Sequence, residues 1–157
     1  MMRVFSFLIL IVFFTSCDKF SFSKNKENQV LDTIVDYTAV DLSPSFPACD
    51  SIIDKTEKSN CFRNTIHKKI GEELQKHSLS SQDSIDETVF VDLLINTEGA
   101  IQFLEVTSSE HIKTQLPTLD SILQLSVDNL PKIFPAIKKR FPVATKYRLP
   151  IRIVLTE

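Results

Sequence analysis

The sequence predicts an α+β fold in which two helices pack on one face of a small three-stranded antiparallel sheet. Three observations lead to this prediction: apolar residues at every fourth position over 62–74, alternating apolar and polar residues around a turn over 88–107, and a second alternating segment over 145–155. Fourfold spacing is typical of an amphipathic helix, and alternation is typical of a strand. With a second helical segment before the last strand, the expected order is α-β-β-α-β.

The first helix is predicted from an apolar stripe that consists of Phe62, Ile66, Ile70 and Leu74. Polar residues occupy its other faces, so that one side can pack on a sheet. Ser59 or Asn60 can cap its first turn by accepting a hydrogen bond from a free backbone amide. The helix is expected to run for about four turns.

A β-hairpin is the clearest local feature of the chain. Residues 88–95 place an aliphatic side chain at every second position, and residues 101–107 form the returning strand. Between them, Asn96-Thr97-Glu98-Gly99 has the composition of a tight turn, in which Gly99 can adopt positive φ without steric cost. Because the chain passes directly from one strand to the next, the sheet is expected to be antiparallel rather than doubly wound.

The second helical segment begins at Pro117 and ends before Pro131, which cannot continue a helix. Residues 131–144 are expected to be irregular, because they contain two further prolines. The last strand covers residues 145–155. Since Pro150 has no amide for a central ladder, this strand is expected at an edge of the sheet or at a bulge. One of its faces is apolar, and the other carries Lys146, Arg148 and Arg152.

The beginning of the chain has the pattern of a secretory signal. Arg3 is the only charged residue before Cys17, and residues 4–14 are apolar apart from one serine. A basic start, an apolar stretch of about 7–15 residues and small residues before the cleavage point are typical of such signals. The apolar stretch is too short for a spanning helix, which needs about 20 residues. Residues 1–16 are therefore predicted to be a signal peptide.

Cys17 directly follows two small residues, which is typical of a lipoprotein signal whose thiol is acylated. Phe14 departs from that pattern at the place where leucine is commonest. A lipid on Cys17 would hold the protein on a membrane surface without spanning it. The alternative is ordinary cleavage that leaves an unmodified thiol. The first interpretation predicts a periplasm-facing protein of the cell envelope, anchored in the inner or the outer membrane.

Composition narrows the class of partner. The formal net charge is −2 and the cations are scattered, so no nucleic-acid partner is expected. The chain has only two glycines, Gly71 and Gly99, and these cannot form a glycine-rich phosphate loop. Residues 17–43 are interpreted as the lipid-attachment cysteine and a flexible tether. Residues 44–157 are the predicted domain.

Cys49 and Cys61 are twelve residues apart and flank a polar loop. In an oxidising compartment they are expected to form a disulfide, which contributes about 3 kcal/mol in the chain-entropy model. A redox-active pair is a weaker interpretation, since such pairs are usually two residues apart. A zinc site that includes His67 would lack a fourth ligand at any familiar spacing.

No set of residues has the sequence pattern of a catalytic or metal site. The three histidines, His67, His77 and His111, are scattered and are expected to be solvated. No serine stands in the context of a strained nucleophile turn. The protein is therefore predicted not to be an enzyme and to need no cofactor or metal.

Several short motifs occur in a fixed order over residues 40–157. They are Phe46-Pro47-Ala48-Cys49, Cys61-Phe62, Val89-Phe90-Val91-Asp92-Leu93-Leu94-Ile95-Asn96, Glu98-Gly99-Ala100-Ile101, Leu116-Pro117-x-Leu119-Asp120, Leu130-Pro131-Lys132-Ile133-x-Pro135-Ala136, Pro142-Val143 and Lys146-Tyr147-Arg148-Leu149-Pro150-Ile151. In this order they resemble the C-terminal domain of TonB, in the variant common among Bacteroidetes-type bacteria. The resemblance implies an α+β domain of the predicted type, with a role in protein binding.

Domains that resemble this one capture an extended segment of an outer-membrane receptor by adding it as a strand to the edge of their sheet. The resemblance therefore implies a protein or peptide partner, with a TonB-dependent outer-membrane receptor as the leading candidate. The candidate edge consists of Lys146, Tyr147, Arg148, Leu149, Ile151, Arg152 and Ile153. The alternative is that the tether or a second copy of the chain covers this strand.

The sequence departs from the family in two places. Lys139-Arg140-Phe141 stands where a glycine-containing turn is usual, and the first residues resemble a cleaved signal rather than a retained membrane helix with a long proline-rich span. Energy transduction by this chain alone is therefore not expected. A structural or accessory lipoprotein of an envelope assembly is a second interpretation, and a small envelope enzyme is a third.

Overall fold

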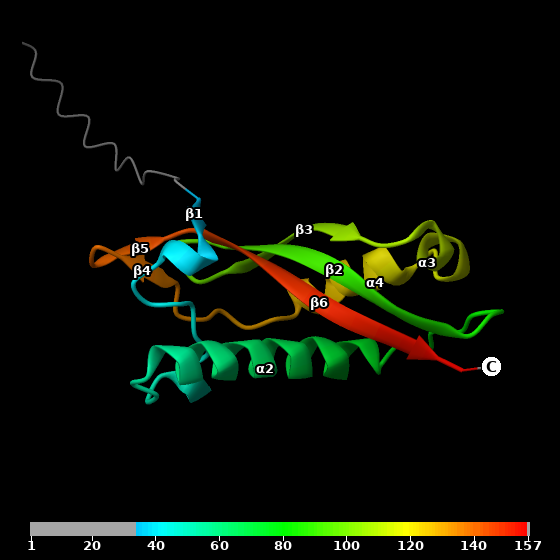
Figure 1. Cartoon of the computed structure of the whole chain (residues 1–157), viewed down its shortest axis with the longest axis horizontal. Helices are drawn as coiled ribbons and strands as arrows, with labels where there is room; N and C mark the ends of the chain where they lie inside the picture. Colours follow the sequence, from blue (N-terminus) through cyan, green and yellow to red (C-terminus); the bar gives the residue numbers. More distant parts are fainter. Residues whose placement is uncertain (1–33, 157) are drawn as a thin grey trace, which may run out of the picture. The chain divides into compact units, whose positions relative to one another are not determined.

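The computed structural model describes residues 34–156, which belong to one compact unit (Figure 1). A four-stranded sheet has the order β1-β6-β2-β3, and a separate two-stranded sheet consists of β4 and β5. The elements are β1 (Val35–Asp36), the 3-10 helices η1 (Tyr37–Ala39) and η2 (Pro47–Cys49), α2 (Lys55–Leu74), β2 (Ile85–Ile95), β3 (Ile101–Thr107), α3 (Glu110–Gln115), α4 (Leu119–Asp128), β4 (Ala136–Lys138), β5 (Phe141–Val143) and β6 (Thr145–Leu155).

The predicted α+β class is confirmed, and the sheet differs from the prediction by one strand. The strands β3, β2 and β6 pair antiparallel in the expected way. The short strand β1 then pairs parallel with the start of β6, so the sheet is mixed and four-stranded rather than antiparallel and three-stranded. The pairing begins with a hydrogen bond of 2.8 Å from the amide of Val35 to the carbonyl of Ala144.

The helix α2 begins earlier than the sequence suggested. Asp54 has extended backbone angles, and its carboxylate accepts a hydrogen bond of 2.8 Å from the amide of Glu57. This is the geometry of an N-cap. The predicted caps, Ser59 and Asn60, therefore lie inside the helix, because an acid five residues upstream already satisfies a free amide. The apolar stripe is placed as expected, with Phe62, Ile66 and Ile70 buried.

The predicted hairpin is confirmed. The side chain of Asn96 accepts hydrogen bonds from the amides of Glu98 and Ala100, at 3.0 and 2.9 Å. Gly99 has a φ of 77°, as a turn of this kind requires. The strand β2 extends three residues further toward the N-terminus than predicted, because β6 continues to pair with it as far as Ile85.

The region between the β2–β3 hairpin and the last strand contains a short helix for which the sequence made no prediction, and a hairpin where an irregular segment was expected. The helix α3 precedes α4 and is capped by Ser109, whose hydroxyl accepts from the amide of Ile112 at 3.1 Å. Residues 136–143, expected to be irregular, form the β4–β5 hairpin instead. The strand β4 pairs further with the segment before α2 (residues 40–54, the entry segment) through Leu42, whose amide donates to the carbonyl of Ile137.

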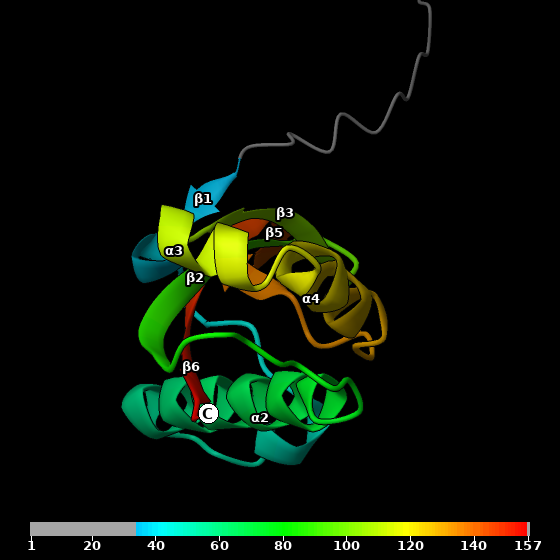
Figure 2. The ribbon, with the colours of Figure 1, turned by 90° about the vertical axis from the view of Figure 1, so that its right-hand side faces the viewer.

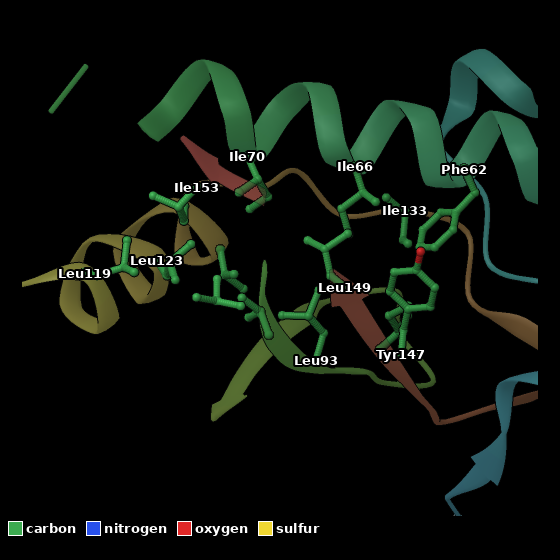
Figure 3. Close-up of a cluster of buried hydrophobic side chains, with 14 of the residues drawn as sticks. Phe62, Ile66, Ile70, Leu93, Leu119, Leu123, Ile133, Tyr147, Leu149 and Ile153 are labelled. Atoms are coloured by element: carbon green, nitrogen blue, oxygen red, sulfur yellow. The ribbon is translucent and has the colours of Figure 1, made fainter. Parts of the chain in front are cut away.

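A single core lies between the sheet and the helices α2 and α4. Figure 2 shows α2 and α4 on two sides of this core and the twisted sheet along the others. Figure 3 shows the side chains of Phe62, Ile66 and Ile70 on α2 pointing toward those of Tyr147 and Leu149 on β6. The opposite face of β2 and β6 is not covered by a helix, since its side chains are exposed or half-buried.

Residues 34–43, assigned to the tether from the sequence, belong to the folded unit. Tyr37 places its ring 6.0 Å from Phe62 and 5.1 Å from Tyr147. Together with the pairing of Val35, this aromatic contact fastens the segment to the start of β6. Residues 34–43 are therefore not part of a flexible tether, and Cys17 and the residues up to 33 lie outside the described residues.

Candidate functional site

The outer edge of β6 is open over most of its length. The strand pairs with β2 from Thr145 to Leu155, whereas β1 pairs with it only at Thr145 and Lys146. Within residues 34–156, no strand pairs with the outer side of residues 147–155. The position expected for Pro150 is thus an edge rather than a bulge, since the β2–β6 register has no shift there. Of residues 34–43, which the sequence assigned to the tether, only β1 pairs with β6, and it covers only Thr145 and Lys146.

The free backbone groups along this edge follow from the pairing. Ala144 directs its carbonyl to the outer side, where Val35 binds it. Backbone direction alternates with a period of two residues, so even-numbered residues of β6 direct their groups the same way. The free amides are therefore those of Arg148, Arg152 and Val154, while Pro150 offers a carbonyl alone.

A groove of about 490 Å³ lies beside this edge, between α2 and the C-terminal half of β6. Its lining residues are His67, Ile70, Gly71, Leu74, Gln75, His77, Leu79, Ile151, Arg152, Ile153, Val154 and Leu155. The absence of a side chain at Gly71 widens the groove on the helix side, and a Cβ at this position would meet no atom within 4 Å. An open strand edge with an apolar groove beneath it can accept a strand whose alternate side chains enter the groove.

The groove brings together two of the histidines that the sequence left scattered, His67 and His77. Burial lowers the pKa of His67, so its imidazole is neutral at pH 7. The lining contains no carboxylate, hydroxyl or thiol. The groove therefore offers apolar contact and a few hydrogen-bonding groups, a composition suited to binding.

The uncharged predicted edge residues and Lys146 take three different positions. Tyr147, Leu149 and Ile153 bury their side chains in the core, with 8%, 0% and 6% exposed, so only their backbone lies at the edge. Burial raises the pKa of Tyr147 to about 12. Ile151 is half-buried and lines the groove. Lys146 is paired with β1 and is not part of the free edge.

The two arginines of β6 bind acids of the neighbouring strand. Arg148 donates to both carboxylate oxygens of Asp92, at 2.7 and 2.6 Å, and Arg152 makes the same two-pronged contact with Asp86 at the same distances. These bonds lower the pKa of both carboxyl groups. Arg148 and Arg152 thus face outward on the open side of the sheet, as the sequence predicts, and their charges are already paired within the sheet.

The disulfide predicted between Cys49 and Cys61 is present, with 5.9 Å between the two Cα atoms. It joins η2 to the second turn of α2. Cys49 is fully buried and belongs to the core cluster, together with Phe46 and Phe62. Its role in the fold is therefore to hold the proline-containing entry segment against the helix.

A cluster of Ser109, Glu87 and His111 lies at the start of α3. The hydroxyl of Ser109 donates to Glu87 at 2.6 Å, and Nδ1 of His111 lies 2.7 Å from the other carboxylate oxygen. The acid stands between the other two groups, so the imidazole does not contact the hydroxyl as a nucleophile would require. No group of three or more potential metal ligands comes together anywhere in residues 34–156.

The groove was not predicted, because its two walls are far apart in the sequence. Gly71, the one glycine of the predicted first helix, was the only signal of an opening there. No helix among the described residues is long and apolar enough to cross a bilayer. Fold and site together define an α+β domain with an open strand edge beside an apolar groove. Comparison of the chain with protein-family models, curated proteins and solved structures found no match.

Proposed function

We propose that residues 34–156 form a binding module that captures an extended segment of a protein partner by adding it to the free edge of β6. The observation that carries the proposal is the open edge over residues 147–155 next to the groove. The resemblance of the motifs to the TonB C-terminal domain adds the class of partner, a TonB-dependent outer-membrane receptor. The proposed activity is binding without catalysis, in support of transport across the outer membrane.

An added strand would make two kinds of contact. Its backbone would bind the amides of Arg148, Arg152 and Val154, which gives affinity regardless of sequence. Every second side chain would point toward α2 and enter the groove above Gly71 and Leu74. Because the lining residues are mostly apolar, the preferred partner is a segment with aliphatic residues at alternate positions.

The protein partner can be sought with solubilised outer-membrane proteins and the immobilised unit 31–157, which has its own core and disulfide. Val154→Pro is the decisive variant, because it removes one free amide and leaves the ladder to β2 intact, as Pro150 already does at an equivalent position. Recovery of a receptor by the wild type and its loss in the proline variant would support strand capture.

Two further variants separate the backbone contact from the side-chain contact. Val154→Ala keeps the amide, so most of the binding should be retained. Gly71→Phe fills the groove without removing any amide, so binding should fall at least tenfold. If no receptor is recovered although circular dichroism shows the unit folded, receptor capture is wrong and an accessory envelope role becomes the better interpretation.

We further propose that the module is held on a membrane through an acylated Cys17. This cysteine lies outside the described residues, and the proposal rests on the residues that precede it. In cells, Cys17→Ser should move the protein from the membrane fraction to the soluble fraction and abolish labelling by a radioactive fatty acid. Unchanged labelling in the variant would contradict the proposal.

A further inference from the structure

The turn of the β4–β5 hairpin has an unusual backbone for its residues. Lys139 and Arg140 both have positive φ, 49° and 70°. Two consecutive residues of this kind form the type of turn that Asn-Gly favours, because a side chain with Cβ is disfavoured in the left-handed region. The turn thus contains Lys139 and Arg140 where a pair such as Asn-Gly would adopt the backbone with less strain. Residues in such strained positions often serve a function.

The cationic side chains at this turn form no ion pair within the described residues. Lys138, Lys139 and Arg140 are consecutive, and none of them forms a salt bridge with any residue in 34–156. Asp41 contacts this turn, but its carboxylate accepts from the backbone amide of Lys139, at 2.7 Å. The arginines of β6, by contrast, are both held by acids, as Arg148 shows with Asp92. The three cations of the hairpin are therefore available for an external anion.

Exposed apolar side chains accompany these cations. Phe141 follows Arg140 directly and is 71% exposed. Phe134 and Leu42 are each close to half exposed, at 48% and 46%; Phe134 lies two residues before β4, and Leu42 pairs with Ile137 of β4. Cations beside an exposed aromatic ring are the combination that binds an anionic membrane surface, where the charges meet the headgroups and the ring enters the interface.

The position of the hairpin in the molecule also favours such a contact. In Figure 1, β4 and β5 are at the same end of the long axis as β1, where the chain from Cys17 joins the domain. Residues 18–33 separate Cys17 from Ile34, and they can reach at most roughly 55 Å when fully extended. A lipid on Cys17 would thus hold Ile34, at the start of this end of the domain, within that distance of the bilayer.

We propose that the β4–β5 hairpin is a membrane-docking element, which binds an anionic phospholipid surface through Lys138, Lys139 and Arg140 and inserts Phe141 into the interface. The inference does not depend on strand capture, and its test contains no protein partner. It also does not require acylation of Cys17, since the contact belongs to the folded unit.

The test uses the unit 31–157 with phospholipid vesicles, either purely zwitterionic or with about one third anionic lipid. Binding measured by cosedimentation should be detectable for the anionic vesicles only and should fall as salt is raised. Lys139→Asn/Arg140→Gly removes two charges and improves the turn. Each cation near the surface changes binding about fivefold, so the double variant should bind about 25-fold more weakly although its melting temperature rises.

Insertion of Phe141 can be followed separately, because the chain contains no tryptophan. In Phe141→Trp, anionic vesicles should shift the emission to shorter wavelength, and brominated lipids should quench it. Leu125→Trp is the matched control: Leu125 is 48% exposed and lies on α4, away from the hairpin. Its emission should not change.

Three results would overturn the proposal. They are equal binding to zwitterionic and anionic vesicles, undiminished binding by the double variant, and equal quenching of the two tryptophans. Because the double variant is expected to be more stable than the wild type, a loss of binding cannot be attributed to unfolding. Failure of this test would leave the strand-capture proposal untouched, since that proposal is measured with detergent-solubilised protein.

Discussion

The two glycines of the chain differ in the space around them, and this determines how a substitution at each position changes the stability of the fold. Gly99 has a φ of 77°, and a Cβ built on it would lie 1.7 Å from the carbonyl oxygen of Ile133. The amide of Ile133 in turn donates to the carbonyl of Gly99 at 2.9 Å. The backbone of residue 133 is therefore fixed against the turn and cannot give way. Gly71, in contrast, has open space where its side chain would be.

We predict that Gly99→Ala lowers the free energy of unfolding by about 1–2 kcal/mol from the left-handed backbone alone. The close contact with Ile133 adds to this loss, because the obstacle is backbone rather than a flexible side chain. Urea denaturation followed by circular dichroism measures the change. A loss below about 0.5 kcal/mol would mean that the turn can rearrange.

Gly71→Ala should have the opposite effect. It lies inside α2, where alanine is favoured over glycine by about 1 kcal/mol, and the added methyl group would point into the groove. Unfolding in urea should therefore require up to about 1 kcal/mol more free energy than in the wild type. A destabilised variant would show that the groove is narrower than the open space at Gly71 indicates.

At the scale of elements, the strands β2 and β6 are joined across their open face by two ion pairs. Asp92 with Arg148 and Asp86 with Arg152 lie on the exposed side of the sheet. The pKa of each carboxyl is below its ordinary value, chiefly through the hydrogen bond from its arginine. The unfolded chain therefore takes up protons before the folded chain does as pH falls.

The stabilisation from these pairs should accordingly be complete above the ordinary pKa of an aspartic acid, about 4, and should be lost as pH falls below it. We predict that Asp92→Asn reduces the decline in unfolding free energy between pH 5 and pH 2. Arg148→Met should reduce it to the same extent, and the double variant should show no further reduction. Additive effects of the two substitutions would contradict a shared ion pair.

The disulfide is a covalent constraint between η2 and α2. Replacing Cys49 and Cys61 with alanine should lower the free energy of unfolding by about 3 kcal/mol in the chain-entropy model, and somewhat more because Cys49 is fully buried. Guanidinium denaturation of the double variant measures this loss. As a control, the wild type is denatured in the absence and in the presence of a reductant. Equal denaturation midpoints for these two samples would show that no disulfide forms.

The elements that could be predicted from the sequence are those with long periodic patterns. The returning strand 101–107 and the last strand 145–155 have the predicted bounds. Elements of three to six residues, such as α3 and β4, carry too few positions to show a period. The prolines of 131–144 led to the prediction of an irregular segment where the second hairpin lies. The groove and the arginine pairs depend on contacts between distant segments, which no local pattern reveals.

At the scale of the whole molecule, the two proposed contacts lie at opposite ends of the long axis. The groove is formed by the second half of α2 and the last residues of β6, at the end marked by the C-terminus in Figure 1. The β4–β5 hairpin lies at the other end, with β1. A domain docked on a bilayer through its hairpin would therefore present the groove away from the surface, where a partner can reach it.

This arrangement predicts that the two contacts are independent. Sites more than about 7–10 Å apart with no shared partners usually act additively, within about 0.5 kcal/mol. Gly71→Phe should therefore leave binding to anionic vesicles unchanged, and Lys139→Asn/Arg140→Gly should leave capture of the receptor from detergent unchanged. Cosedimentation and pulldown measure these two effects. A vesicle-binding defect in Gly71→Phe would place the groove, rather than the hairpin, on the membrane and would reverse the proposed orientation.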